Sequence, residues 1–87
     1  MRRRSAPPVE VKVTLFTKVD CGLCRQAEAA LRRLRRRIPF DLELVDIDSD
    51  EALFRRYWDR VPVMAVDGTE VAAAPLDERR LRLLLSR

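Results

Sequence analysis

Cys21 and Cys24, the only cysteines of the chain, are separated by two residues and lie between an apolar alternating segment and a long helical pattern. Two intervening residues on the first turn of a helix bring the sulfur atoms close enough to form a small disulfide. Such a disulfide can form and break repeatedly without unfolding its surroundings. The position of the pair between a strand and a helix therefore favours a redox function.

The segments around the cysteines predict a strand, a helix and a second strand. Residues 11–17 largely alternate between apolar and polar side chains, which is typical of a strand with a buried face. Apolar residues over 23–38 recur at helical spacing and form one face of a helix, for which Asp20 is a suitable cap. Pro39 is expected to end this helix, and residues 40–47 predict the next strand.

The following segment predicts a short helix and a third strand. Ser49 or Asp50 can cap a helix that continues through Trp58. The apolar run over residues 61–66 predicts a strand that begins at Pro62, because a proline has no backbone N–H to donate inside a sheet.

A hairpin and a helix are predicted for the rest of the chain. Asp67 and Gly68 form a dipeptide typical of a tight hairpin turn, which joins the third strand to a partner over residues 70–73. Pro75 is expected in the first turn of a terminal helix, whose apolar residues extend to Leu85.

The predicted order of elements is β-α-β-α-β-β-α, in one α/β domain over residues 10–87 that follows a mobile tail at residues 1–9. A right-handed crossover makes the first two strands parallel, and the hairpin makes the last two antiparallel. We therefore expect a four-stranded mixed sheet with helices on both faces.

The hydropathy of the chain limits its cellular location. It has no apolar stretch long enough to span a bilayer, and no apolar segment of the signal-peptide type follows Met1. We expect a cytoplasmic location and no membrane partner.

A reducing compartment does not favour a permanent disulfide, so the cysteines are expected to be catalytic, metal-binding or transiently bonded. With no histidine, the chain offers too few ligands for zinc, and we expect no metal and no cofactor.

Arginine dominates the net charge of +4, since only two of the 18 basic residues are lysines. The predicted first helix carries Arg25, Arg32, Arg33, Arg35, Arg36 and Arg37. Most of these lie outside its apolar face, so a solvated surface explains them. The acidic residues over 41–51 follow closely and can pair with them. No interleaved aromatic residues or helix-turn-helix pattern accompany the arginines. Nucleic-acid binding is therefore not expected, and we expect a monomer.

Four features together resemble the glutaredoxin branch of the thioredoxin fold. They are the strand residues 14–18, Cys21-Gly22-Leu23-Cys24 at the start of a helix, Arg60-Val61-Pro62-Val63 before a strand, and Asp67-Gly68 in a hairpin. The similarity covers roughly residues 11–85 and points to small bacterial glutaredoxin-like proteins. It implies a thioredoxin-like (glutaredoxin-type) fold and a thiol–disulfide oxidoreductase.

The two cysteines are expected to have different roles in this chemistry. Disulfide exchange proceeds by thiolate attack, and Cys21 would lie at a helix N-terminus, where backbone N–H groups favour a negative charge. Lys18 would add a positive charge there, whereas Asp20 would oppose it. Cys24 lies one helical turn deeper, so we expect Cys21 to attack the substrate and Cys24 to resolve the mixed disulfide. Gly22 leaves room for the substrate to approach.

The resemblance also implies contacts with the substrate. In this fold the proline that matches Pro62 is cis and faces the CxxC motif, and the backbone of the residue that matches Val61 pairs with the substrate. Leu23 replaces the aromatic residue that is usual inside the motif.

The type of substrate is open at this point. Better-known glutaredoxins hold glutathione with two glycines and an acidic pair after the hairpin, whereas residues 71–76 contain no glycine, and only Asp77 and Glu78 remain as acidic contacts. We expect protein or glutathione-type disulfides as substrates, with an unidentified reductase as the electron donor. The alternatives are a redox-sensing or binding domain of the same fold, or a dimer that holds an iron–sulfur cluster.

Overall fold

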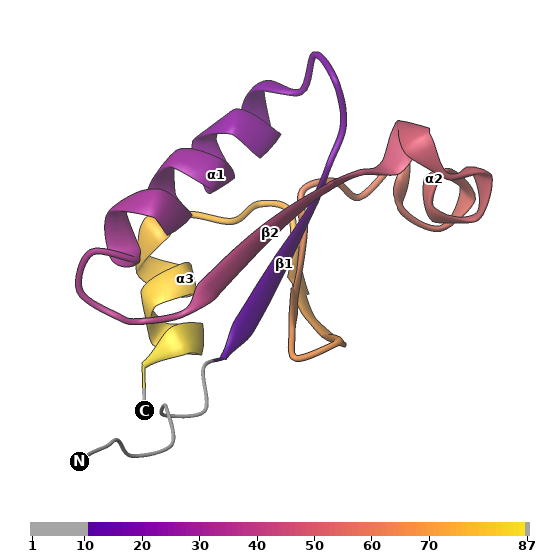
Figure 1. Ribbon diagram of the computed structural model, residues 1–87. Helices are drawn as coiled ribbons and strands as arrows, with labels where there is room; N and C mark the ends of the chain where they lie inside the picture. The colour runs from indigo at the N-terminus through magenta and orange to yellow at the C-terminus, as the bar shows by residue number, and fades with distance from the viewer. Residues whose placement is uncertain (1–10, 87) are drawn as a thin grey trace.

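The computed structural model describes residues 11–86, which form a layered α/β domain (Figure 1). Its elements in chain order are β1 (Lys12–Thr17), α1 (Gly22–Leu34), β2 (Asp41–Asp46), a 3₁₀ turn η1 (Ile47–Ser49), α2 (Glu51–Tyr57), β3 (Val63–Val66), β4 (Thr69–Ala73) and α3 (Glu78–Leu85). The predicted order of strands and helices is confirmed, with η1 as an unpredicted addition. The predicted tail and the start of the domain at residue 10 lie outside the described residues.

The four strands form one mixed sheet in the order β2-β1-β3-β4. β1 is parallel to β2, with Leu15 opposite Leu44. β3 is antiparallel to β1, with Met64 opposite Leu15, and β4 is antiparallel to β3, with an irregularity between Met64 and Ala65. The parallel and antiparallel pairs follow the prediction from the crossover and the hairpin.

Both faces of the sheet carry a hydrophobic cluster, because side chains of a strand point alternately to its two sides. Val13 and Leu15 of β1 belong to the larger cluster, which packs between the sheet and helices α1 and α3. Phe16 packs on the smaller cluster instead, where its ring lies 4.6 Å from that of Tyr57 at the end of α2. Helices thus cover both faces, as predicted.

The predicted end of α1 at Pro39 is wrong, because the helix stops at Leu34. Arg36 N–H donates to the carbonyl oxygen of Arg33 at 3.2 Å, and Arg37 N–H donates to that of Leu34 at 2.9 Å. These bonds reach back three residues and tighten the last turn. Ile38 remains half-buried and packs against the larger cluster, which explains why its position fits the apolar periodicity.

The predicted place of Pro75 in the first turn of α3 is also wrong. The helix begins at Glu78, and Asp77 is its cap, with Oδ1 accepting a hydrogen bond from Arg80 N–H at 2.8 Å. A capping aspartate satisfies a free N–H of the first turn, so it determines where the helix starts. Pro75 lies in the connection from β4, and the Ala74–Pro75 peptide bond is cis.

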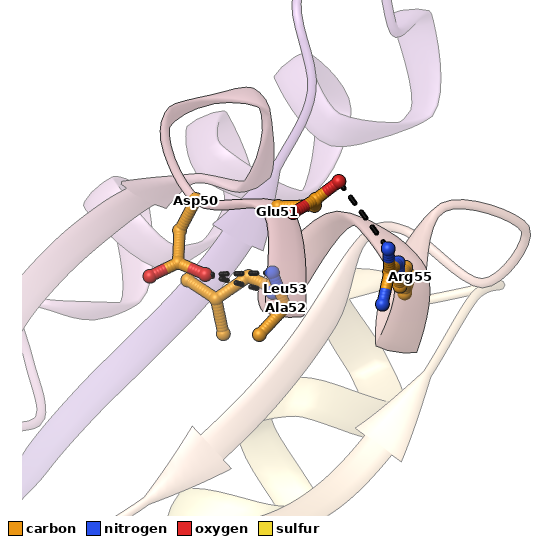
Figure 2. Close-up of polar contacts among 5 residues, drawn as sticks. All are labelled: Asp50, Glu51, Ala52, Leu53 and Arg55. Carbon is orange, nitrogen blue, oxygen red and sulfur yellow. Dashed lines mark hydrogen bonds and ion pairs between the residues drawn. The ribbon is translucent and has the colours of Figure 1, made fainter.

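Asp50 is the N-terminal cap of α2. It is one of the two residues, Ser49 and Asp50, that were predicted as candidates for this cap. Figure 2 shows its carboxylate accepting hydrogen bonds from the backbone N–H groups of Ala52 at 2.8 Å and Leu53 at 3.1 Å. On the same helix, the exposed side chains of Glu51 and Arg55 form an ion pair at 3.3 Å. The helix ends at Tyr57, with Trp58 as its C-terminal cap.

Replacing Asp50 with alanine is expected to lower the free energy of unfolding by about 1 kcal/mol, because two N–H groups of the first turn lose their acceptor. Urea denaturation measures the change. Glu51→Ala on the same turn is the control, and its expected cost is about 0.3–0.5 kcal/mol, since it removes an exposed i,i+4 ion pair. Equal losses in the two variants would contradict a stabilising role of the cap.

No helix within residues 11–86 is both long and apolar enough to cross a membrane.

Candidate functional site

The CxxC motif lies where β1 leads into α1. Residues 18–20 connect the two elements, and Asp20 adopts a positive φ of 62°. This left-handed turn, which aspartate tolerates better than most residues, places Cys21 rather than Asp20 at the cap. The predicted cap Asp20 is therefore wrong. Cys21 Sγ itself accepts the hydrogen bond of the first turn, from Cys24 N–H at 3.1 Å.

Cys21 and Cys24 form a disulfide, with their Cα atoms 5.2 Å apart. Cys21 is half-buried at the start of the helix, whereas Cys24 is 2% exposed and faces the interior. A partner molecule approaching from solvent therefore meets Cys21 first. The structure brings the two predicted cysteines together at the predicted strand-to-helix junction.

The residues that flank the motif differ in their accessibility. Leu23 is 52% exposed between the two cysteines. Beyond its chain neighbours and its own helix backbone, a Cβ atom added to Gly22 would meet only Arg25 Nη2, at 3.9 Å, so the space at Gly22 is open. Lys18 directs its ammonium group toward α2, where Nζ lies 5.5 Å from the centre of the Phe54 ring. A cation over an aromatic ring is attracted to it, so this contact connects the loop before the motif to α2.

The segment before β3 contains the cis Val61–Pro62 peptide bond that the resemblance implies. Pro62 is fully buried, and Val61 N–H donates to the carbonyl oxygen of Tyr57 at 3.2 Å. The backbone of Arg60 accepts a bond from Ala74 N–H at 3.4 Å, which attaches the segment to the end of β4. The expectation that Pro62 faces the disulfide stays a prediction.

The side chain of Arg60 anchors the same segment, and the sequence reasoning missed this role. Its Nη1 donates to Glu70 Oε2 at 2.7 Å and its Nη2 donates to Glu70 Oε1 at 3.3 Å. The guanidinium also lies over the Tyr57 ring, 5.2 Å from its centre. The hairpin brings β4 beside β3. The sequence feature that could have predicted this ion pair is the basic Arg60 just before Val61-Pro62 together with the acidic Glu70 on the second strand of the hairpin.

The bond from Arg60 lowers the pKa of Glu70, while the carboxylate raises the pKa of Arg60. A lowered carboxyl pKa in the folded protein means that the unfolded chain binds more protons at acidic pH. The stabilisation is thus present above the ordinary pKa of glutamate and is lost as the pH falls through the lowered value. We expect a small effect, because the two side chains are 39% and 31% exposed.

Urea denaturation between pH 7 and pH 3 measures this dependence. Wild-type protein should be more stable than Glu70→Gln at pH 7, and the difference should shrink as the pH falls. A difference that stays constant over the whole range would contradict the ionic origin.

Asp77 and Glu78, the predicted acidic contacts, both bond within the protein. Asp77 caps α3, and Glu78 Oε1 lies 2.8 Å from Arg33 Nη2 of α1. Asp77 also lines a hollow between α1 and α3, together with Gln26 and other residues. Its role toward a substrate stays a prediction.

Among the described residues, the first-helix arginines form no ion pair with the acidic residues over 41–51, which the sequence offered as possible partners. Arg32 pairs with Glu28 at 3.0 Å, because residues four apart adjoin on a helix, and Arg33 pairs with Glu78 because α3 packs beside α1. In the 41–51 segment, Glu43 pairs with Lys12 and Glu51 pairs with Arg55.

Comparisons with known proteins agree with this geometry. The family model described as "Glutaredoxin-like domain (DUF836)" matches residues 12–86. An uncharacterized protein of Mycobacterium tuberculosis is 31% identical over 81 residues, which cover 87% of this chain and 84% of the relative.

Solved structures extend the likeness to the fold. A protein from Nitrosomonas europaea has a TM-score of 0.74 and 33% identity, covering 99% of this chain and all of that one. A protein from X. campestris has a TM-score of 0.72 and 40% identity over 84% of this chain and 93% of that one. A mutant thioredoxin from Halobacterium salinarum has a TM-score of 0.68 and 27% identity over 87% of this chain and 72% of that one. The fold is thus thioredoxin-like.

Proposed function

The chain belongs to the glutaredoxin-like domain family, and from this membership we propose that it is a thiol–disulfide oxidoreductase that works through Cys21 and Cys24. One observation carries the proposal. The two cysteines form a disulfide at the start of α1, in which Cys21 is half-buried and Cys24 is 2% exposed. An unequal pair of this kind suits a reaction in which one cysteine attacks and the other resolves.

The proposed reaction begins with the reduced dithiol. The Cys21 thiolate attacks one sulfur of a substrate disulfide, so that a Cys21–substrate bond forms and the second substrate sulfur leaves as a thiolate. Cys24, after losing its proton, then attacks Cys21 Sγ and releases the first substrate sulfur. Two electrons pass from the dithiol to the substrate, and the protein ends with the Cys21–Cys24 disulfide.

The start of α1 supports the choice of Cys21 as the attacking group. Cys24 N–H points at Cys21 Sγ from 3.1 Å, and the positive end of the helix dipole lies at the same place. Both stabilise a thiolate relative to a thiol. Cys24 lies among the buried residues and has no direct access to a bulky substrate.

For the substrate we propose a protein or low-molecular-weight disulfide. Leu23 is exposed next to Cys21, and the space at Gly22 is open. We propose Lys18, the Val61–Pro62 segment and Asp77 as further substrate contacts. We propose the cytoplasm as the compartment, because a dithiol reductant needs reducing surroundings. The electron donor is either glutathione or a reductase of the thioredoxin reductase type.

Turnover of a mixed-disulfide substrate tests the proposal, with glutathione and glutathione reductase in one arm and thioredoxin reductase in the other. Turnover in either arm supports the oxidoreductase and identifies its donor. The reduction potential of the cysteine pair is measured in parallel and is expected within about −270 to −120 mV, the span of known dithiol oxidoreductases. The absence of turnover in both arms, with a potential outside this span, would refute the proposal.

A further inference from the structure

A hollow of about 450 Å³ lies between helix α3 and the C-terminal end of α1, which are next to each other in Figure 1. Four arginines line it, namely Arg33, Arg36, Arg37 and Arg82, together with Glu78. The CxxC motif is at the opposite end of α1, and a helix of 13 residues is about 20 Å long. The hollow is therefore separate from the redox pair.

Positive charge in the hollow exceeds the negative charge available within the described residues. Glu78 binds Arg33, with its Oε1 2.9 Å from Nε and 2.8 Å from Nη2. No ion pair within residues 11–86 involves Arg36, Arg37 or Arg82. Three neighbouring guanidinium groups repel one another, and an anion between them would remove that repulsion.

The arginines of the hollow do not serve to cap the C-terminal end of α1. The carbonyl oxygens of Leu31, Arg33 and Leu34 at the end of the helix accept bonds from backbone N–H groups. Arg35 does use its side chain on a carbonyl group, since its Nε donates to Phe40 at 3.1 Å. The side chains of Arg36, Arg37 and Arg82 make no such bond within the described residues, so their charges are available to a ligand.

The size and lining of the hollow limit the class of ligand. A volume of about 450 Å³ lies in the range of small-molecule sites. Leu34 and Ile38 add an apolar wall, and the guanidinium group matches the geometry of phosphate and carboxylate groups. None of the lining residues is aromatic, so bases of a nucleic acid would find no ring on which to stack.

We propose that this hollow is a binding site for a small oxyanion that carries several negative charges. Arg36, Arg37 and Arg82 bind its phosphate or carboxylate groups, while the ion pair between Arg33 and Glu78 forms one wall. The site acts independently of the Cys21–Cys24 pair.

Calorimetric titration of the full chain with pyrophosphate and, separately, with citrate tests this proposal at a fixed ionic strength of about 0.15 M. We expect saturable binding of at least one probe, and the better one identifies phosphate or carboxylate as the favoured group. The double variant Arg36→Ala/Arg82→Ala should weaken binding by about tenfold or more, because it removes two charged donors.

The double variant Arg55→Ala/Arg56→Ala is the matched control, since it loses the same net charge from exposed residues of α2, which does not line the hollow. Its affinity should stay within about twofold of wild type, because distant exposed charges are screened. In amide NMR spectra, pyrophosphate or citrate should shift signals from residues 33–38 and from α3, and not those of the CxxC motif. Equal losses in the two variants, shifts elsewhere, or no binding of either probe would overturn the site.

Discussion

Replacing Cys21 with serine is expected to abolish disulfide exchange, lowering the rate by on the order of 10³-fold or more, to the uncatalysed background. Cys21 is the more exposed cysteine of the pair, and a serine hydroxyl does not ionise near neutral pH. Cys24, at 2% exposure, cannot take over the attack on a bulky substrate. Turnover of the mixed-disulfide substrate in the preferred donor system measures the loss.

Cys24→Ser is the matched variant, with the same chemical change one helical turn away. It should still complete the first step and then accumulate the Cys21–substrate mixed disulfide, which mass spectrometry under non-reducing conditions detects. Cys21→Ser should form no such adduct. An adduct on Cys24 in the Cys21→Ser protein, together with retained turnover, would reverse the assigned roles.

Leu31→Ala is expected to lower the free energy of unfolding by about 2–5 kcal/mol. Leu31 is 0% exposed and packs in the larger cluster between α1 and the sheet, so truncation leaves a cavity that its surroundings fill only in part. In a domain of this size, such a loss corresponds to a fall in melting temperature of roughly 10 °C or more. Urea denaturation and thermal unfolding measure the two quantities.

Leu83→Ala is the control for this change, because the same side chain on α3 is 69% exposed. It should alter stability by less than about 0.5 kcal/mol. If the two variants were equally stable, the packing of α1 on the sheet would not be the main source of stability.

The alternation of strands and helices was predictable from the sequence, because the periodicity of apolar residues reflects which faces are buried. Residues 11–17 and 23–38 carried clear repeats, and these became β1 and α1. The boundaries were less predictable. Ile38 fits the helical repeat because it contacts the same core, although the helix ends at Leu34. A helical repeat of buried residues therefore does not show whether its last member lies in the helix or in the turn that follows the helix.

Contacts between distant segments were the part that the sequence did not reveal. Arg33 binds Glu78 across two helices, and Arg60 binds Glu70 across a hairpin. Each pair depends on how elements pack, which local patterns do not encode. The prediction of Asp20 as the cap of α1 was wrong for a different, local reason, since the left-handed turn at Asp20 moves the cap to Cys21.

The two faces of the sheet differ in the size of the hydrophobic cluster that packs their helices. α1 and α3 share the larger cluster, whereas the seven-residue α2 packs on a small one centred on Ile47, Tyr57 and Val63. Segments with little buried apolar surface open locally at a lower free energy than the whole domain unfolds. Amide hydrogens of α2 should therefore exchange with solvent well before those of α1. Because Lys18 lies over Phe54 of α2, each such opening would also release the loop that leads into the cysteine pair.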